Sequence, residues 1–187
     1  MKKLIIFQLF SALIFFGCNQ ESEITSPEQS VQTQGPNWIA LPTSEGLRVN
    51  TIYTATKTIK GFTGGTIKIN ESYMTPDRKR VSISASLKFP KNAFEGTKEV
   101  TMTPEQLYGG AQFSPEGSFN LRALYNVTFM GLDLTGVNPA DVDFVYLNDY
   151  GTIEPIEYDY LDVNISTGSI RLSNAKLNHF SRYGFVN

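Results

Sequence analysis

The sequence predicts an all-β protein folded as an antiparallel sandwich or barrel. The clearest observation is the segment 81–89, in which every odd position is apolar and every even position is polar. A period of two is typical of a strand with one face on a core. The chain is also rich in Thr, Val, Ile, Tyr and Phe, and glycine and proline recur at short intervals. Because the pattern offers no crossover helices, we expect no parallel sheet.

Short strands separated by turn signals are the expected elements along the chain. Many short strands of this kind are typical of an all-β sandwich or barrel. The one helical candidate is residues 104–108, about one turn long, with Thr103 as its N-cap. The expected strands are residues 51–59, 65–73, 81–89, 99–103, 121–130, 142–147, 152–158, 161–165, 169–172 and 177–186.

Turns between these strands follow from proline and glycine. Residues 75–78 suit a type I turn, because Pro76 stands at the second position, where its fixed φ is favourable. Gly151 and Gly168 are placed to close two later hairpins, since glycine takes positive φ at little cost. These turns separate successive antiparallel strands.

The N-terminus has the parts of an export signal. Lys2 and Lys3 form a positive start, and residues 4–16 form an apolar run that Gly17 separates from Cys18. A run of about 13 residues is too short to span a bilayer, which needs about 20. We therefore expect a signal peptide and no membrane-spanning helix here.

Cys18 is the only cysteine of the 187 residues. The sequence Phe15-Phe16-Gly17-Cys18 resembles the lipobox of bacterial lipoproteins, although these usually carry Leu at the first position and a small residue at the second. The resemblance implies lipidation of Cys18, and several acyl chains at about 0.8 kcal/mol per buried CH₂ would hold the protein on a membrane. An ordinary secretory peptide cut elsewhere and an uncleaved N-terminal anchor are the alternatives.

The residues after Cys18 are polar and predict a disordered tether. They cannot bury enough apolar surface to offset the entropy of ordering, and about 19 flexible residues span roughly 25 Å. Glu21 and Glu23 resemble the acidic export patches of surface lipoproteins. We therefore expect a location in the bacterial cell envelope, at the outer membrane, on its periplasmic or surface face. The predicted organisation is a signal peptide over residues 1–17, a lipidated tether over 18–37 and one domain over 38–187.

Short segments of the expected domain resemble, in order, those of a ZU5-type β-sandwich. The resemblance covers roughly residues 61–187, with Asn120 and Leu121 where a Lys-Pro pair is common in that family. It implies an antiparallel β-sandwich that serves as an interaction or scaffold module more than as a metabolic enzyme. The segments are Gly64-Gly65-Thr66-Ile67, Leu87-Lys88-Phe89-Pro90-Lys91-Asn92-Ala93-Phe94, Phe113-Ser114-Pro115-Glu116-Gly117-Ser118-Phe119 and His179-Phe180-Ser181-Arg182-Tyr183.

The triplet His179-Phe180-Ser181 is the one candidate for catalysis. In some eukaryotic relatives of the ZU5 fold, a His-Phe-Ser sequence cleaves itself between Phe and Ser. Positions i and i+2 of a strand share a face, so His179 could accept the proton of Ser181 while its hydroxyl attacks the Phe180 carbonyl. The apolar pattern also predicts a bulge near residues 180–182. The alternative is an ordinary terminal strand, in which the His179 and Ser181 side chains are hydrogen-bonded and take no part in chemistry.

Charge is segregated along the chain. No Lys or Arg lies between Arg122 and Arg171, a stretch that is rich in Asp and Glu. With a net charge of only −2, this pattern indicates a dipolar surface and excludes a typical nucleic-acid binder. Asp141 and Asp143 are candidates for a Ca²⁺ site, because hard cations take carboxylate oxygens. The alternative is that these carboxylates are solvated loop and strand positions.

Tyrosines are interleaved with these acids at Tyr146, Tyr150, Tyr158 and Tyr160. Exposed tyrosines beside carboxylates could stack on sugar rings or anchor a protein partner. Cross-strand tyrosine pairs within an antiparallel sheet would give the same composition with no ligand.

Function classes that remain are a membrane-tethered, non-enzymatic interaction module, a self-cleaving module and a conventional hydrolase. The sequence contains no nucleophile elbow, P-loop, HExxH or GxGxxG motif, so we expect no enzyme of these types and no cofactor. The expected function is an envelope lipoprotein that binds a protein or glycan partner. Self-cleavage between Phe180 and Ser181, or surface glycan binding, is the alternative.

Overall fold

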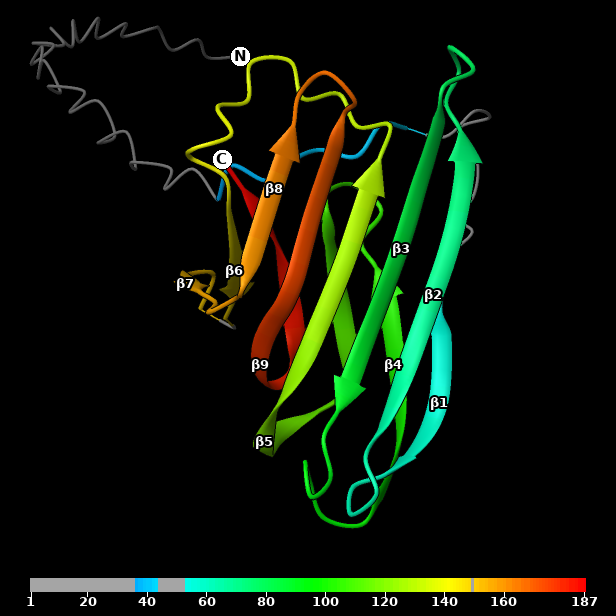
Figure 1. Cartoon of the computed structure of the whole chain (residues 1–187), viewed down its shortest axis with the longest axis vertical. Helices are drawn as coiled ribbons and strands as arrows, with labels where there is room; N and C mark the ends of the chain where they lie inside the picture. The colour runs from blue at the N-terminus through cyan, green and yellow to red at the C-terminus, as the bar shows by residue number, and fades with distance from the viewer. Residues whose placement is uncertain (1–35, 44–52, 149) are drawn as a thin grey trace, which may run out of the picture. The chain divides into compact units, whose positions relative to one another are not determined.

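The computed structural model describes residues 36–43, 53–148 and 150–187, which Figure 1 draws in colour. The predicted signal peptide, Cys18 and the tether up to residue 35 lie outside the described residues. Within the described part the chain is all-β, and every strand pair is antiparallel. No described segment forms a helix long and apolar enough to cross a membrane.

All the strands of the described residues belong to a single sheet. The expected antiparallel, all-β fold class is therefore confirmed at this level. The strands are β1 (Ala55–Lys60), β2 (Gly65–Met74), β3 (Arg80–Phe89), β4 (Thr97–Pro104), β5 (Gly110–Met130), β6 (Asp143–Leu147), β7 (Ile153–Pro155), β8 (Tyr160–Asn164) and β9 (Ser169–Val186).

Two long strands, β5 and β9, change neighbours along their length. In the second part of β5 and the first part of β9, the sheet runs β2-β3-β5-β9-β8, which we call the front half. In their other parts it runs β1-β4-β5-β9-β6-β7, the back half. Figure 1 shows the front strands side by side, from β2 to β8. Because β5 and β9 belong to both halves, they connect the two sets of strands.

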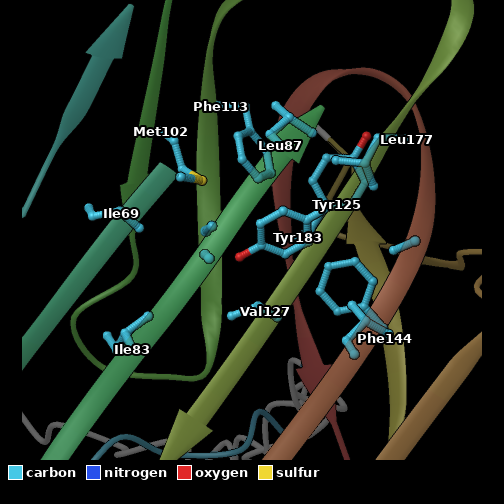
Figure 2. Packing of buried hydrophobic residues seen from close by; sticks show 14 of the residues in the cluster. Ile69, Ile83, Leu87, Met102, Phe113, Tyr125, Val127, Phe144, Leu177 and Tyr183 are labelled. Carbon is cyan, nitrogen blue, oxygen red and sulfur yellow. The ribbon is translucent and has the colours of Figure 1, made fainter. Parts of the chain in front are cut away.

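The core lies against the inner faces of these strands. In β3 the odd residues from Val81 to Phe89 are at most 6% exposed, which confirms the alternation predicted for this segment. Large aromatic side chains from both halves then pack together, as Figure 2 shows for Tyr125 and Tyr183. The ring of Tyr125 lies 5.2 Å from that of Phe113. Burial raises the pKa of the Tyr125 and Tyr183 phenols, so both enter the core as neutral groups.

Predicted turns form where proline and glycine indicated them. The Arg78 N–H donates to the Thr75 carbonyl at 2.9 Å, which closes the turn over residues 75–78. Gly151 and Gly168 have φ values of 77° and 59°, so each uses the left-handed conformation that favours glycine. Local chain chemistry therefore determines these reversals.

The prediction of a helical turn at residues 104–108 is wrong. Pro104 ends β4 and pairs with Ala111, and Tyr108 forms a bridge with Ala40. A single isolated turn of helix has little stability of its own, so pairing between β4 and β5 prevails. These residues instead connect the two strands.

Several strand boundaries also differ from those expected. The expected strand 121–130 is only the second part of β5, which begins at Gly110. The segments 169–172 and 177–186 are continuous in β9, because pairing with β5 resumes after an irregularity at which Asn174 takes a φ of 53°. The expected strand 152–158 is reduced to β7.

The segment before β1 is tied to the end of β9. The Ile39 N–H donates to the Phe185 carbonyl at 2.9 Å, and the Trp38 ring stacks on Tyr108 at 4.6 Å between centroids. Of the predicted tether, Pro36 and Asn37 are described, and Asn37 exchanges hydrogen bonds with Asn187.

Candidate functional site

The triplet His179-Phe180-Ser181 lies in the second part of β9. The Tyr183 hydroxyl lies 3.1 Å from His179 Nδ1 and donates to the His179 carbonyl at 2.9 Å. The Tyr146 ring contacts the imidazole edge-on, at 4.4 Å between centroids. Among the described residues no hydrogen bond joins His179 to Ser181. The imidazole is therefore engaged with Tyr183 and not with the serine hydroxyl.

The pairing of β9 with β5 is irregular at Ser181. Gln112 pairs with Arg182 and Gly117 pairs with Phe180, so four residues of β5 stand opposite one residue of β9. An irregularity was predicted at this point, but the extra residues belong to β5 and not to β9. They fall within the proline-containing segment 113–119.

Phe180 belongs to an aromatic cluster at this end of the core. It is 3% exposed, and its ring lies 4.6 Å from Phe119, 5.8 Å from Phe89 and 6.4 Å from Phe94. The backbone of Phe89 in turn contacts Gly64 so closely that a β-carbon there would collide with it. The segments that resemble the ZU5 family therefore meet in space.

The candidate calcium ligands Asp141 and Asp143 already have protein partners. Asp141 accepts from the Asn138 amide at 2.7 Å, and Asp143 accepts from the Tyr158 hydroxyl at 3.0 Å. In residues 36–43, 53–148 and 150–187 no group of three or more His, Cys, Asp or Glu side chains could hold a metal ion. The calcium hypothesis stays a prediction.

The candidate tyrosines do not form one platform. Tyr146 is half-buried against His179 and Tyr183, and the hydroxyl of Tyr158 binds Asp143. Tyr150 is 93% exposed beyond β6, and Tyr160 is 52% exposed in β8.

A polar groove of about 290 Å³ crosses the outward face of the front half. We call it the outer groove. Its polar lining comes from successive strands whose paired residues share a face, so the side chains form rows across the sheet. The groove is lined by Lys68 and Asn70 of β2, Ser84, Ala85 and Ser86 of β3, Asn126, Val127 and Thr128 of β5, and Arg171, Leu172 and Ser173 of β9.

Alternation in the strands explains why the groove is polar. The odd positions of β3 enter the core, so Ser84 and Ser86 face outward beside the row from β2. Ser84 donates to the Asn70 side-chain oxygen at 2.7 Å. Serine, threonine and asparagine are short, so they leave a hollow between longer side chains and line it with donors and acceptors.

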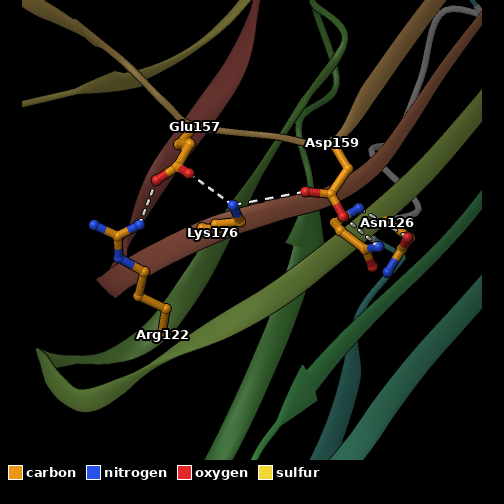
Figure 3. Close-up of polar contacts among 6 residues, drawn as sticks. Arg122, Asn126, Glu157, Asp159 and Lys176 are labelled. Atoms are coloured by element: carbon orange, nitrogen blue, oxygen red, sulfur yellow. Dashed lines mark hydrogen bonds and ion pairs between the residues drawn. The ribbon is translucent and has the colours of Figure 1, made fainter.

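An ion-pair network lies beside the groove (Figure 3). Lys176 Nζ lies 2.7 Å from Glu157 and 3.6 Å from Asp159, and Arg122 lies 2.5 Å from Glu157. Hydrogen bonds from Lys176 and Arg122 lower the pKa of the Glu157 carboxyl. These two cations are thus neutralised by local carboxylates.

The cations that line the groove differ from Lys176 and Arg122 in their ion pairing. In the described part of the chain no ion pair within 4.0 Å involves Lys68 or Arg171. Arg171 pairs in register with Asp162 of β8, yet their side chains do not form such a pair. The groove therefore presents two cations that solvent or a ligand can reach.

Sequence reasoning did not find the outer groove. The alternating serines of the segment 81–89 predict that one strand face is polar, but no local pattern relates Lys68 to that face. Which residues of other strands lie beside those serines depends on pairing between distant segments.

The outer groove can bind a polar ligand through hydroxyl, amide and cationic groups, all held on paired strands. This surface brings together polar side chains from four strands. Comparison of the chain with known protein families, with curated proteins and with solved structures gives no match.

Proposed function

We propose that this chain is a lipid-anchored protein of the bacterial cell envelope that works as a non-enzymatic binding module. Cys18 carries the lipid, and the protein lies at the outer membrane, on its periplasmic or surface face. The domain is a ZU5-like β-sandwich, in which the two sheet halves are the two layers. Its binding surface is the outer groove, which takes a protein or glycan partner of the envelope.

The outer groove is the observation that carries this proposal. Its side chains come from β2, β3, β5 and β9, all of which are hydrogen-bonded to neighbours. Such a surface is ordered before a ligand arrives, so binding requires little reorganisation of the backbone. An open, polar, preformed surface suits recognition of a partner.

The aromatic cluster around Phe180 supports the ZU5-like assignment. Phe89, Phe119 and Phe180 come from three separate segments that resemble the family, and they contact one another in the core. Segments that specify one fold are expected to cooperate in packing, so their convergence favours the resemblance.

The contacts of His179 favour binding over self-cleavage. A general base must lie within hydrogen-bond reach of the proton that it removes. The imidazole instead interacts with Tyr183 and Tyr146, and the Tyr183 hydroxyl is held by the same contact. We therefore assign His179, Phe180 and Ser181 to the packing of β9.

Intact mass spectrometry of the protein purified from bacterial membranes tests the anchor and the absence of cleavage together. We expect a chain that begins at an acylated Cys18 and ends at Asn187, because no step of the proposal cuts the domain. The Cys18→Ser variant should lack the acyl mass and leave the membrane fraction. An unmodified Cys18 would contradict the anchor, and a chain that ends at Phe180 would contradict the non-enzymatic assignment.

Filling the outer groove tests the binding surface. Ser84→Trp places a large side chain in the centre of the groove, so we expect less envelope material, protein or glycan, to crosslink to the chain in intact cells. Thr58→Trp is the matched control, because Thr58 is an exposed strand residue of β1 in the back half. Equal crosslinking by the wild type and both variants would exclude the groove as the binding surface.

A further inference from the structure

We propose that the ligand of the outer groove is an acidic polysaccharide that carries carboxylate groups on its sugar rings. The inference rests on the proposed function and names the ligand class of the same groove. Charge, the chemistry of the groove floor and its length each support it.

Charge on this face is opposite in sign to that of the whole chain. The chain has a net charge of −2. The outward positions of β2, β3, β5 and β9 in the front half, by contrast, carry basic side chains and no carboxylate, and β8 at the edge adds one, Asp162. Such a local excess of positive charge attracts anions, and this attraction weakens as the salt concentration rises. The basic residues are Lys68, Arg80, Lys88, Arg122, Arg171 and Lys176.

Two of these cations are placed to bind a ligand. Lys176 is held by Glu157 and Asp159, whereas Lys68 and Arg171 line the groove on its first and last strands. The Arg171 guanidinium is a planar fork that matches a carboxylate with two parallel hydrogen bonds. An anionic group at each end of the groove would therefore find a partner.

The floor of the groove favours a sugar over a peptide. Hydroxyl and amide side chains both donate and accept hydrogen bonds, as sugar hydroxyls do. A docked peptide usually needs apolar pockets for its side chains. The apolar lining residues Ala85, Val127 and Leu172 are only 6%, 2% and 1% exposed, so they offer almost no surface for such pockets.

The length of the groove favours a chain of several sugars. Lys68 and Arg171 lie on strands separated by three strand-to-strand steps, which is roughly 14 Å. Tyr160 of β8 pairs with Ser173, so the row continues past the groove to a half-exposed aromatic ring that can stack on a sugar. A chain of several sugars is long enough to contact both cations along this span.

Binding of the full chain in detergent to carboxylated polymers tests this inference. Polygalacturonate, alginate and hyaluronate are the acidic probes, and fully methyl-esterified polygalacturonate is the matched neutral probe. We expect at least one acidic probe to bind, with at least tenfold weaker binding after esterification. Arg171→Ala should weaken binding by about tenfold or more, as expected for loss of a hydrogen bond to a charged group. Lys91→Ala, in the exposed turn after β3, should leave binding unchanged.

Several results would overturn the inference. Equal binding to the esterified polymer, or equal losses with Arg171→Ala and Lys91→Ala, would show that groove charge does not select the ligand. Failure of all three acidic polymers, while Ser84→Trp still abolishes crosslinking in cells, would reject the acidic glycan and leave the proposed function standing. Binding to phosphatidylglycerol vesicles in place of the polymers, lost with Arg171→Ala, would assign the groove to a lipid surface instead.

Discussion

Replacing Phe180 with alanine is expected to lower the free energy of unfolding by about 3–5 kcal/mol, the usual loss for a buried phenylalanine. The side chain is 3% exposed and lies against Phe89, Phe94 and Phe119. Its removal leaves a cavity that the three aromatic rings, held on β3, on β5 and on the loop after β3, cannot easily fill. Urea unfolding followed by circular dichroism measures the change.

Phe62 provides the matched control for this experiment. It is 64% exposed in the turn between β1 and β2, so Phe62→Ala should change the free energy by no more than about 0.5 kcal/mol. Similar losses for the two variants would contradict the packing role of Phe180. That outcome would reopen a role for this residue in chemistry at its carbonyl.

Replacing Gly64 with alanine is expected to lower the free energy of unfolding by about 3–5 kcal/mol, from backbone strain and overpacking together. Gly64 has a φ of 70°, which a residue with a β-carbon adopts only at a cost. A β-carbon there would also lie 2.7 Å from the Pro90 carbonyl oxygen and closer still to that of Phe89. These are backbone atoms of the β3 end, so they cannot turn away as a side chain would.

Gly96 separates the two causes of this effect. Its φ is 71°, but no atom lies within 4 Å of the position that a β-carbon would take. Gly96→Ala should therefore lose only the conformational part, about 1–2 kcal/mol. Thermal unfolding of both variants gives the difference directly. If Gly96→Ala proves as destabilising as Gly64→Ala, the close approach of the first turn to the end of β3 is not important for stability.

Local patterns predicted the strands whose two faces differ most. The segment 81–89 alternates without exception, so one register alone buries its apolar side chains, and the structure has it as β3. Turns at Pro76 and Gly168 were predictable for a related reason, because their φ requirements belong to single residues. Such features need no knowledge of the rest of the chain.

Predictions failed where distant pairing outweighs local preference. Residues 104–108 are compatible with one helical turn, but the partner strand of β4 lies directly after them. The first part of β5 was missed because the segment 113–119 contains a proline and four successive positions that face solvent, residues 115–118. Its pairing with β4 and the end of β9 places it in the sheet.

For the candidate site the same distinction holds. The triplet at His179 was identified from its sequence, but the sequence could not show that the Tyr183 hydroxyl lies within hydrogen-bond distance of His179 Nδ1. The outer groove joins residues about 100 positions apart in the chain, from Lys68 to Arg171. No local pattern relates them, since strand register across β2, β3, β5 and β9 decides which side chains become neighbours.

The sequence by itself determined that this chain is an antiparallel β protein, because alternation with a period of two and turn residues act within a few positions. It also carries the lipobox-like segment at Cys18, whose recognition requires no folded domain. Only the tertiary structure decided that β5 and β9 serve both halves of the sheet, that Phe180 lies in the core, and that Lys68 and Arg171 line one groove. These depend on contacts between segments far apart in the chain, and such contacts form only when the whole core closes.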